Sequence, residues 1–446
     1  MGRRSVPAPK RSVLAPLAGL MLAAASPALA EPPPAIDGPS ALGGAAGLGP
    51  FFDALRELKT GRRQAPVQIL QIGDSHTAAD HIASGVRARL QARFGEGGRG
   101  VLPPGVPFKG YSPRQIDVAQ SDGWTLEPSF PLAANGAGFG LSGWRLTSTR
   151  AGASVTMSAD PEALFDKAVV CAVAQPNAGP LTIRAGDSRT EVSLGAESAQ
   201  PVCRSIPLGG LKNKLELSAP SGPVTLLSFG AWRSEGGVSL SNLGVIGSQL
   251  YDFAARDDRI LKAELSTYAP DLIILAFGTN EGFRPQFDPA SYEALVKAQI
   301  RRLKRMAPGA AILLLGPPDA NMVRPDIPED GVHDLNLNCG PLTPDETANY
   351  AQLVEAKSPA LARWYPPPAL APVREAQRRA AAAEGAAFWD WSQRMGGACA
   401  AHRLSRPGVG LVRGDHVHFT GDGGDMIAAM LTKDLLDAYD AKRGGG

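Results

Sequence analysis

The chain has 446 residues, 44% of them hydrophobic and 20% charged, and its formal net charge is +2 at pH 7. A chain of this length can bury two hydrophobic cores. Because basic and acidic residues nearly balance and no large basic face is indicated, the composition argues against a nucleic-acid-binding protein.

The first 30 residues have the features of a secretory signal peptide. A basic start at residues 3–11 precedes an apolar stretch at 13–25, and Ala28-Leu29-Ala30 is a small-x-small cleavage site. The apolar stretch is short for a membrane span, and no other stretch approaches a spanning length. Residues 1–30 hold four basic residues and no acidic one, so their removal changes the formal net charge from +2 to −2. We expect an exported, periplasmic protein without a membrane span; an uncleaved anchor is the alternative.

The next segment leads to a candidate functional residue, Ser75. Residues 31–50 are rich in Pro, Gly and Ala and are predicted to be a flexible leader, with a helix from about residue 51. The apolar run 67–72 predicts a buried strand, and apolar spacing predicts a helix over 77–94. Ser75 is therefore expected at a strand-to-helix corner, which is a common place for chemistry in an open α/β sheet.

From residue 110 to about residue 234 the helical period disappears. Short apolar alternations separated by Gly, Pro, Ser and Asn predict the strands of an all-β sandwich or jelly roll. The clearest of them are 154–158, 168–173, 181–184, 214–218 and 224–229.

The α/β pattern then returns. The continuous apolar runs 271–277 and 310–316 are typical of parallel strands covered on both faces. A helical stretch lies between them, and a last helix is expected over 422–439. One α/β domain is therefore predicted to be interrupted by a β domain. The predicted parts are 51–109 and 235–446 for the α/β domain and 110–234 for the β insert.

All four cysteines lie beyond the predicted signal peptide. An even number of cysteines in an exported protein favours disulfides, and four cysteines allow three pairings. We prefer Cys171–Cys203 and Cys339–Cys399, because each pair then lies within one predicted domain. Buried free thiols are the alternative for the first pair.

Ser75 needs a base to become a nucleophile, and Asp415-His416-Val417-His418 offers one. The three-residue offset lets the Asp415 carboxylate bond one imidazole nitrogen of His418 and leaves the other nitrogen to face the serine. His416 lacks this offset and is the less suitable base. In the structural alternative, Asp74 and Ser75 only cap the following helix and the two histidines are surface residues.

Two further segments could stabilise an oxyanion. Gly278-Thr279-Asn280-Glu281 follows the predicted strand 271–277, so the Asn280 amide could donate to a developing negative charge. Gly247 precedes a predicted helix, where its N–H could be a second donor. Taken alone, either segment would be interpreted as a turn.

Together these segments resemble one family. Gly73-Asp74-Ser75, Gly247, Gly278-x-Asn280 and Asp415-x-x-His418 match, in order, the four sequence blocks of the SGNH (GDSL-type) hydrolases. The resemblance implies a flavodoxin-like three-layer α/β/α domain. It implies that Ser75 is the nucleophile, that His418 is its base, and that Asp415 orients the base. The Ser75 and Gly247 N–H groups and the Asn280 amide would form the oxyanion hole. The α/β-hydrolase elbow Gly-x-Ser-x-Gly is absent around Ser75.

Other segments resemble the periplasmic peptidoglycan O-acetylesterases of the SGNH class. They are 72–82, 90–95, 98–100, 277–281, 316–319 and 388–397. Those esterases carry a carbohydrate-module-like β domain between the first and second blocks, where this chain has its predicted insert. The resemblance implies a serine esterase that removes O-acetyl groups from a cell-envelope glycan, most simply peptidoglycan, with no metal or organic cofactor.

A metal-dependent hydrolase is one alternative. Asp74, His76, His416 and His418 could be ligands, but the further ligand segments of metallophosphoesterases are missing after residue 76.

Three other functions are also alternatives. An O-acetyltransferase would form the same acyl-enzyme and pass the acyl group to a sugar hydroxyl, and an esterase could act on another acetylated polysaccharide. A glycan-binding protein without catalysis would depend on the β insert. Its candidate sugar platforms would be Trp124, Trp144 and Trp232, although each tryptophan also suits a buried core.

Overall fold

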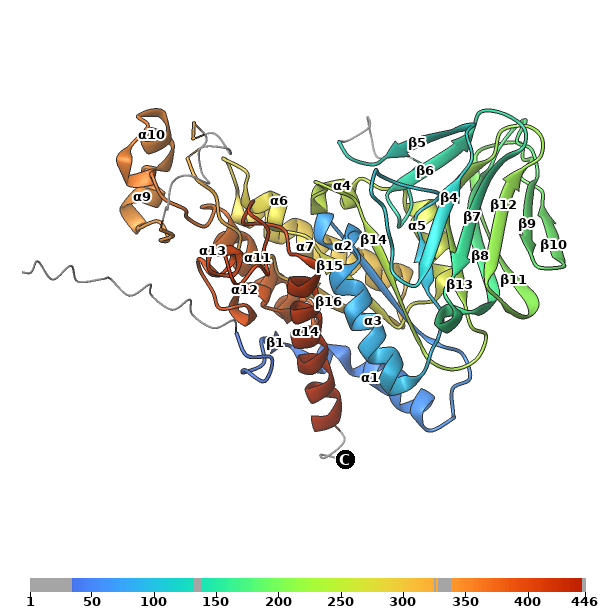
Figure 1. Ribbon diagram of the computed structural model, residues 1–446, viewed down its shortest axis with the longest axis horizontal. Helices are drawn as coiled ribbons and strands as arrows, with labels where there is room; N and C mark the ends of the chain where they lie inside the picture. Colours follow the sequence, from blue (N-terminus) through green and yellow to red (C-terminus); the bar gives the residue numbers. More distant parts are fainter. Residues whose placement is uncertain (1–33, 132–137, 325, 328–337, 443–446) are drawn as a thin grey trace, which may run out of the picture. The chain divides into compact units, whose positions relative to one another are not determined.

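The computed structural model describes residues 34–131, 138–324, 326–327 and 338–442. The predicted signal peptide, residues 1–30, lies outside the described residues. The described chain contains one α/β sheet and two antiparallel sheets (Figure 1). In this part of the chain, no helix is both long and apolar enough to cross a membrane.

The α/β sheet has six strands in the order β1-β17-β16-β15-β2-β14. Their bounds are Leu42–Gly43 (β1), Val67–Gly73 (β2), Val238–Gly244 (β14), Leu272–Ala276 (β15), Ala311–Leu315 (β16) and Ala387–Trp389 (β17). The strands from β14 to β17 are parallel, and numbered along the chain they have the flavodoxin-like order 2-1-3-4-5. The predicted flavodoxin-like fold is therefore confirmed.

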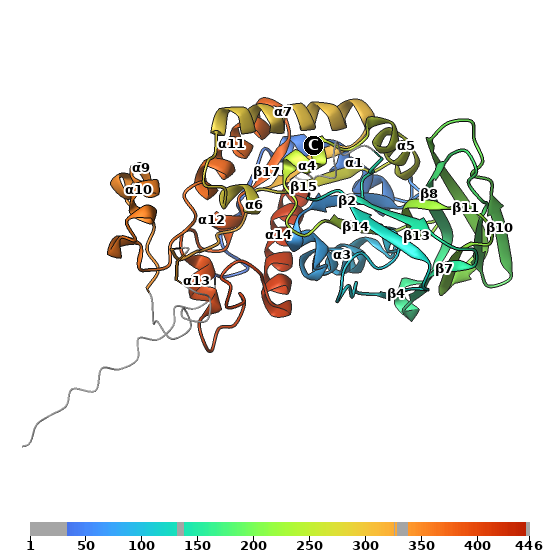
Figure 2. The same cartoon turned by 90° about the horizontal axis from the view of Figure 1, so that it is seen from above.

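Helices cover both faces of this sheet, which explains why β15 and β16 are apolar throughout. One face packs against α1 (Gly49–Lys59), α3 (His81–Phe94) and α14 (Gly421–Ala441). The other face packs against α5 (Asp258–Tyr268), α7 (Pro289–Met306) and α11 (Leu370–Ala383). Figure 2 shows α3 and α7 on opposite sides of β2 and β15.

The β insert is a sandwich of two antiparallel sheets around its own core. One sheet has the order β10-β9-β12-β7-β4, and the other has the order β11-β8-β13-β6-β5 with β3 also paired to β13. The bounds are Gly100–Leu102 (β3), Ile116–Gln120 (β4), Trp124–Pro128 (β5), Trp144–Ser148 (β6), Ala153–Ala159 (β7), Phe165–Ala174 (β8), Leu181–Ala185 (β9), Ser188–Val192 (β10), Gln200–Lys212 (β11), Lys214–Ala219 (β12) and Thr225–Trp232 (β13). The sandwich therefore includes a strand that precedes the expected boundary at residue 110.

The prediction of a flexible leader over residues 31–50 is wrong for its second half. β1 pairs with β17, and the Ala41 N–H donates to Asp434 Oδ2 at 3.0 Å. Leu48 is fully buried in the core that contains α14. The Pro, Gly and Ala content was misleading because the partners of this segment lie more than 300 residues further along the chain.

Two disulfides are present, in the pairs preferred above. Cys171 on β8 and Cys203 on β11 are register partners, with Cα atoms 4.1 Å apart. Cys339 is joined to Cys399, with Cα atoms 5.8 Å apart, at the start of α13 (Ala400–Ser405).

Candidate active site

Ser75 begins the short helix α2 (Ser75–Ala78) directly after β2. The corner is tight, because a Cβ on Gly73 would overlap the Ala276 carbonyl oxygen of β15. Asp74 caps α2 by accepting from a backbone N–H two residues further on at 3.0 Å. The cap interaction is thus made by Asp74, and the half-buried Ser75 hydroxyl is directed to His418.

Ser75, His418 and Asp415 form a hydrogen-bonded chain. The Ser75 Oγ lies 3.0 Å from His418 Nε2, and His418 Nδ1 lies 2.8 Å from Asp415 Oδ2. Asp415 Oδ1 accepts from the backbone N–H groups of Val417 and His418, each at 2.9 Å. Burial raises the pKa of Asp415, but the hydrogen bonds from His418 and the two N–H groups outweigh burial and hold it well below its usual range. Asp415 is therefore a carboxylate that holds the proton on Nδ1, which leaves Nε2 to accept from Ser75.

Gly247 and Asn280 follow the two strands that flank β2. Because β14, β2 and β15 are adjacent and parallel, the segments after their carboxyl ends meet at one edge of the sheet. Gly247 has a φ of +78°, a conformation that favours glycine. Asn280, in α6 (Thr279–Gly282), donates from Nδ2 to the Ser248 carbonyl at 3.0 Å. The Asn280 amide is thus held beside the loop that carries Gly247.

Glu281 connects these two segments, although the sequence pattern indicated no role for it. Its side chain is buried, and Oε1 accepts from the Leu250 N–H at 2.8 Å and from the Tyr292 hydroxyl at 3.3 Å. Burial raises the pKa of Glu281 to about 7. Since Glu281 is adjacent to Asn280 and Leu250 follows the Gly247 loop, this carboxyl group joins the two loops.

His76 joins the corner at Ser75 to the loop that carries His418. Its Nδ1 lies 3.3 Å from Asp74 Oδ1, and its Nε2 lies 3.0 Å from the Val417 carbonyl oxygen. The buried ring stacks on His418 with centroids 5.4 Å apart. Burial lowers the pKa of His76, but the Asp74 carboxylate and the Val417 carbonyl outweigh burial and raise it above its usual value. The sequence suggested His76 only as a metal ligand; its position next to Ser75 was the signal for this other role.

The histidines considered as metal ligands lie in different surroundings. The His416 ring stacks on Trp364 with centroids 3.6 Å apart, whereas His418 faces Ser75. Within the described residues, no group of three or more His, Cys, Asp or Glu side chains is arranged to hold a metal ion.

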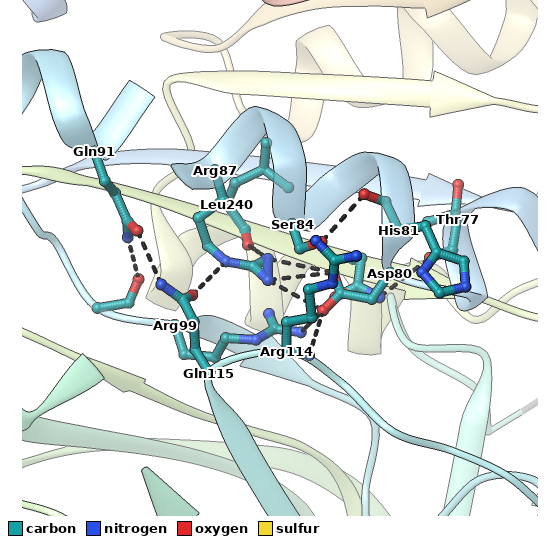
Figure 3. A network of polar contacts seen from close by, with 12 residues as sticks. Thr77, Asp80, His81, Ser84, Arg87, Gln91, Arg99, Arg114, Gln115 and Leu240 are labelled. Carbon is teal, nitrogen blue, oxygen red and sulfur yellow. Dashed lines mark hydrogen bonds and ion pairs between the residues drawn. The ribbon is translucent and has the colours of Figure 1, made fainter. Parts of the chain in front are cut away.

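A buried ion-pair network supports α2, the helix that begins at Ser75 (Figure 3). Asp80 follows α2 with a φ of +56°, and its Oδ2 accepts from Arg87 at 3.1 Å and from Arg99 at 3.2 Å. Arg99 also donates to Asn242 Oδ1 at 2.6 Å, and Asn242 donates to the Thr77 carbonyl at 3.1 Å. The network thus holds α2 against β14 without contributing a group to the Ser75 chain.

A small pocket opens beside Ser75 and His418. It has a volume of about 40 Å³ and is also lined by His76, His81, Ile82 and Phe419. A pocket volume of roughly 10–15 Å³ is enough to hold one water molecule. The pocket therefore has room for a group of a few heavy atoms.

The tryptophans considered as sugar platforms are largely structural. Trp144 is 7% exposed and Trp232 is 1% exposed. Trp124 is half-buried and donates from Nε1 to the Ser154 carbonyl at 3.1 Å. Burial therefore leaves neither Trp144 nor Trp232 able to stack on a sugar.

The fold and the arrangement around Ser75 define a class of hydrolase. A flavodoxin-like sheet with a serine after its first strand and an Asp-x-x-His segment before its last helix is the plan of the SGNH-type hydrolases. Residues 226–425 match the family of GDSL-like lipases and acylhydrolases. The resemblance is therefore confirmed: the chain carries a hydrolase domain of this family and is an esterase.

Solved structures extend the comparison to the insert. The structure described as "Peptidoglycan O-acetylesterase in action, 5 min" is similar with a TM-score of 0.70 and 26% identity, over 90% of this chain and 99% of that chain. An active-site mutant of a family two carbohydrate esterase from Clostridium thermocellum shares 12% identity over 71% of this chain and 98% of that chain, with a TM-score of 0.26. No curated protein matches the chain in sequence.

Proposed function

We propose that the protein is an exported serine esterase that removes O-acetyl groups from a cell-envelope glycan, namely peptidoglycan. The observation that carries the proposal is the hydrogen-bonded chain Ser75–His418–Asp415 beside a pocket of about 40 Å³. Such a chain activates a serine hydroxyl, and such a pocket suits an acetyl group. The similarity to a structure described as a peptidoglycan O-acetylesterase supports the choice of glycan.

In the proposed reaction, Ser75 Oγ bonds to the acetyl carbonyl carbon while its proton passes to His418 Nε2. The resulting oxyanion accepts from the Ser75 and Gly247 N–H groups and the Asn280 amide. The bond to the sugar oxygen then breaks, and His418 returns the proton to that oxygen. Water, deprotonated by His418, then bonds to the carbonyl carbon of acetyl-Ser75. The bond to Ser75 Oγ breaks, His418 returns the proton to Oγ, and acetate leaves. Asp415 stabilises the imidazolium in both halves of the reaction.

The proposal includes export with removal of residues 1–30. The disulfides Cys171–Cys203 and Cys339–Cys399 support an oxidising compartment, where such bonds persist. Amino-terminal mass spectrometry of the protein recovered from the periplasm should find a chain that begins at residue 31. Recovery of the intact chain from the cytoplasm would contradict the proposal.

The substrate is tested by incubating the purified protein with O-acetylated peptidoglycan, acetylated xylan and acetylated exopolysaccharide. Free acetate and acetylated acceptor are measured for each. We expect acetate to be released fastest from peptidoglycan. Faster release from another polymer would identify that polymer as the substrate and contradict the choice of peptidoglycan. Transfer of the acetyl group to a glycan acceptor without free acetate would identify an O-acetyltransferase. Binding without turnover would identify a glycan-binding protein.

A further inference from the structure

We propose that a groove beside the Gly247 and Asn280 loops binds a neutral sugar unit of the glycan chain, next to the sugar that carries the acetyl group. The groove has a volume of about 750 Å³, and its lining includes Phe130, Gln249, Tyr251, Arg284 and Phe287. This inference rests on the proposed esterase activity and adds a binding subsite to it.

The groove adjoins the two loops that carry Gly247 and Asn280. Gln249 directly follows Ser248, whose carbonyl accepts from the Asn280 amide at 3.0 Å. Arg284 follows α6 and donates to Gln249 Oε1 at 3.4 Å. On the insert side, Phe130 lies so close to Gly247 that a Cβ there would be 2.8 Å from its ring. A ligand in the groove therefore lies beside the groups expected to hold the acetyl carbonyl.

The aromatic rings of the groove are supported by a buried tyrosine. The rings of Tyr251 and Phe287 lie 6.1 Å and 5.3 Å from the Tyr292 ring. Tyr292 is fully buried, and its hydroxyl donates to Glu281 at 3.3 Å and accepts from Gln377 at 3.0 Å. Because Glu281 also accepts from the loop after Gly247, the aromatic platform and the oxyanion loops share one rigid support.

The polar lining of the groove comprises the Arg284 guanidinium, two glutamine amides, the Tyr251 hydroxyl and two carboxylates. The exposed Arg284 guanidinium lies over Tyr251, 5.2 Å from the ring centroid. The two lining carboxylates are used by helix caps. Asp252 accepts from the Gln249 N–H at 2.7 Å, and Asp288 accepts from the second residue of α7 at 3.0 Å. Rings beside available N–H donors suit a pyranose, whose C–H face packs on an aromatic ring while its hydroxyl and amide oxygens accept hydrogen bonds.

The pocket beside Ser75 and the groove therefore bind different parts of the substrate. The pocket of about 40 Å³ beside Ser75 has room for the acetyl group, whereas the groove of about 750 Å³ has room for a sugar. A long acyl chain is the other occupant that the size of the groove would allow. The Arg284 guanidinium in its lining argues against that occupant, because burying an unpaired charge against an alkyl chain costs free energy.

The test compares kcat/KM of the full chain on two acetyl esters: peptide-free O-acetylated peptidoglycan strands, and 4-nitrophenyl acetate, which carries no sugar. For Arg284→Ala and Tyr251→Ala, the ratio of the glycan value to the small-ester value should fall about tenfold. Arg259→Ala is the matched control, because Arg259 is an exposed arginine that lines a separate cavity of about 670 Å³. Its ratio should equal that of the wild type.

The outcomes separate the two proposals. A wild-type protein that hydrolyses 4-nitrophenyl acetate but releases no acetate from glycan overturns the proposed function. A wild-type protein active on glycan whose Arg284→Ala and Tyr251→Ala variants keep the wild-type ratio overturns the groove alone. If Arg259→Ala instead lowers the ratio of glycan to small-ester activity, the sugar binds in the cavity that Arg259 lines, and the groove proposal is overturned. Preference for 4-nitrophenyl octanoate that disappears in Tyr251→Ala would assign the groove to an acyl chain and overturn the inference. Thermal midpoints check that the half-buried Tyr251 can be truncated without unfolding.

Discussion

The α/β domain and the β insert differ in the kind of polar side chain that they bury. In the insert, within residues 110–131 and 138–234, the buried polar side chains are all Ser or Thr. The α/β domain instead buries ionisable groups, among them Asp80, Arg87 and Glu281. Buried charges cost free energy unless they are paired and hydrogen-bonded, so they indicate where geometry matters more than stability. Asp74 and His76 lie at the corner of Ser75, Asp80 and Arg87 hold the helix that begins there, and Glu281 joins the loops beside it.

The largest effect is expected for Ser75, the proposed nucleophile. Ser75→Ala should lower kcat on an acetyl ester by on the order of 10⁴-fold or more, because no oxygen is left to accept the acetyl group. The thermal midpoint should change little, since Asp74 and not Ser75 caps α2. Ser218→Ala, at a half-buried serine of β12 in the insert, is the matched control and should keep full activity. An active Ser75→Ala protein would contradict the mechanism.

Loss of Asn280, a proposed oxyanion donor, should lower the activity less than loss of Ser75 but more than any substitution in the insert. Asn280→Ala removes one donor and should lower kcat by roughly 10²–10³-fold, with a smaller effect on KM. Asn213→Ala changes an exposed asparagine of the insert and serves as the control. Equal kinetics of the two variants would show that Asn280 acts only through its hydrogen bond to Ser248.

The contact between the two regions should make stability depend on pH through Glu264. This α5 residue is fully buried, accepts from the insert at the Leu141 N–H at 2.5 Å, and is also bonded to Ser228. Burial raises its pKa to about 7 from 4.5, so between these values the folded state binds more protons than the unfolded state. The neutral Glu264 carboxyl therefore contributes fully to the free energy of unfolding below about pH 4.5, and this contribution is lost as the pH rises through about 7. The contribution is at most about 3 kcal/mol.

Glu264→Gln keeps a neutral side chain at every pH and should not lose this stability. Chemical unfolding at pH 5 and pH 8 should show the wild type losing more of its free energy of unfolding than the variant. Identical pH profiles would mean that Glu264 does not titrate in the folded protein.

The smallest effect is expected for His76, which positions other groups. His76→Phe keeps an aromatic ring beside His418 but removes the hydrogen bonds to Asp74 and the Val417 carbonyl. We expect kcat to fall about tenfold with KM almost unchanged, because a slightly misplaced base slows the reaction. His76→Asn, which can still donate a hydrogen bond, should recover part of that loss. A large rise in KM would instead place His76 in substrate binding.

Several features could be predicted from local sequence. β15 and β16 are continuous apolar runs, as expected of strands covered on both faces, and the mainly apolar run of β2 ends at Gly73. Asp415 and His418 could be paired because three residues is the spacing at which one loop brings a carboxylate to an imidazole. In the insert, period-two alternation revealed the strands of a sandwich.

The remaining elements depended on contacts between distant segments. β14 alternates Ser with Leu, a pattern of a half-exposed strand, yet it is wholly buried because β3 covers it and the Val101 N–H donates to Ser241 Oγ at 2.7 Å. β1 and β17 are too short to be recognised before they pair with each other.

By itself, the sequence determined the class of fold, the corner at Ser75 and the base expected to act there, because each depends on a short, local pattern. Only the tertiary structure decided that His76 and Glu281 connect the loops and that a groove lined by Tyr251 and Arg284 lies beside them. These features are made by side chains from different loops, and a linear pattern carries no information about which loops will meet.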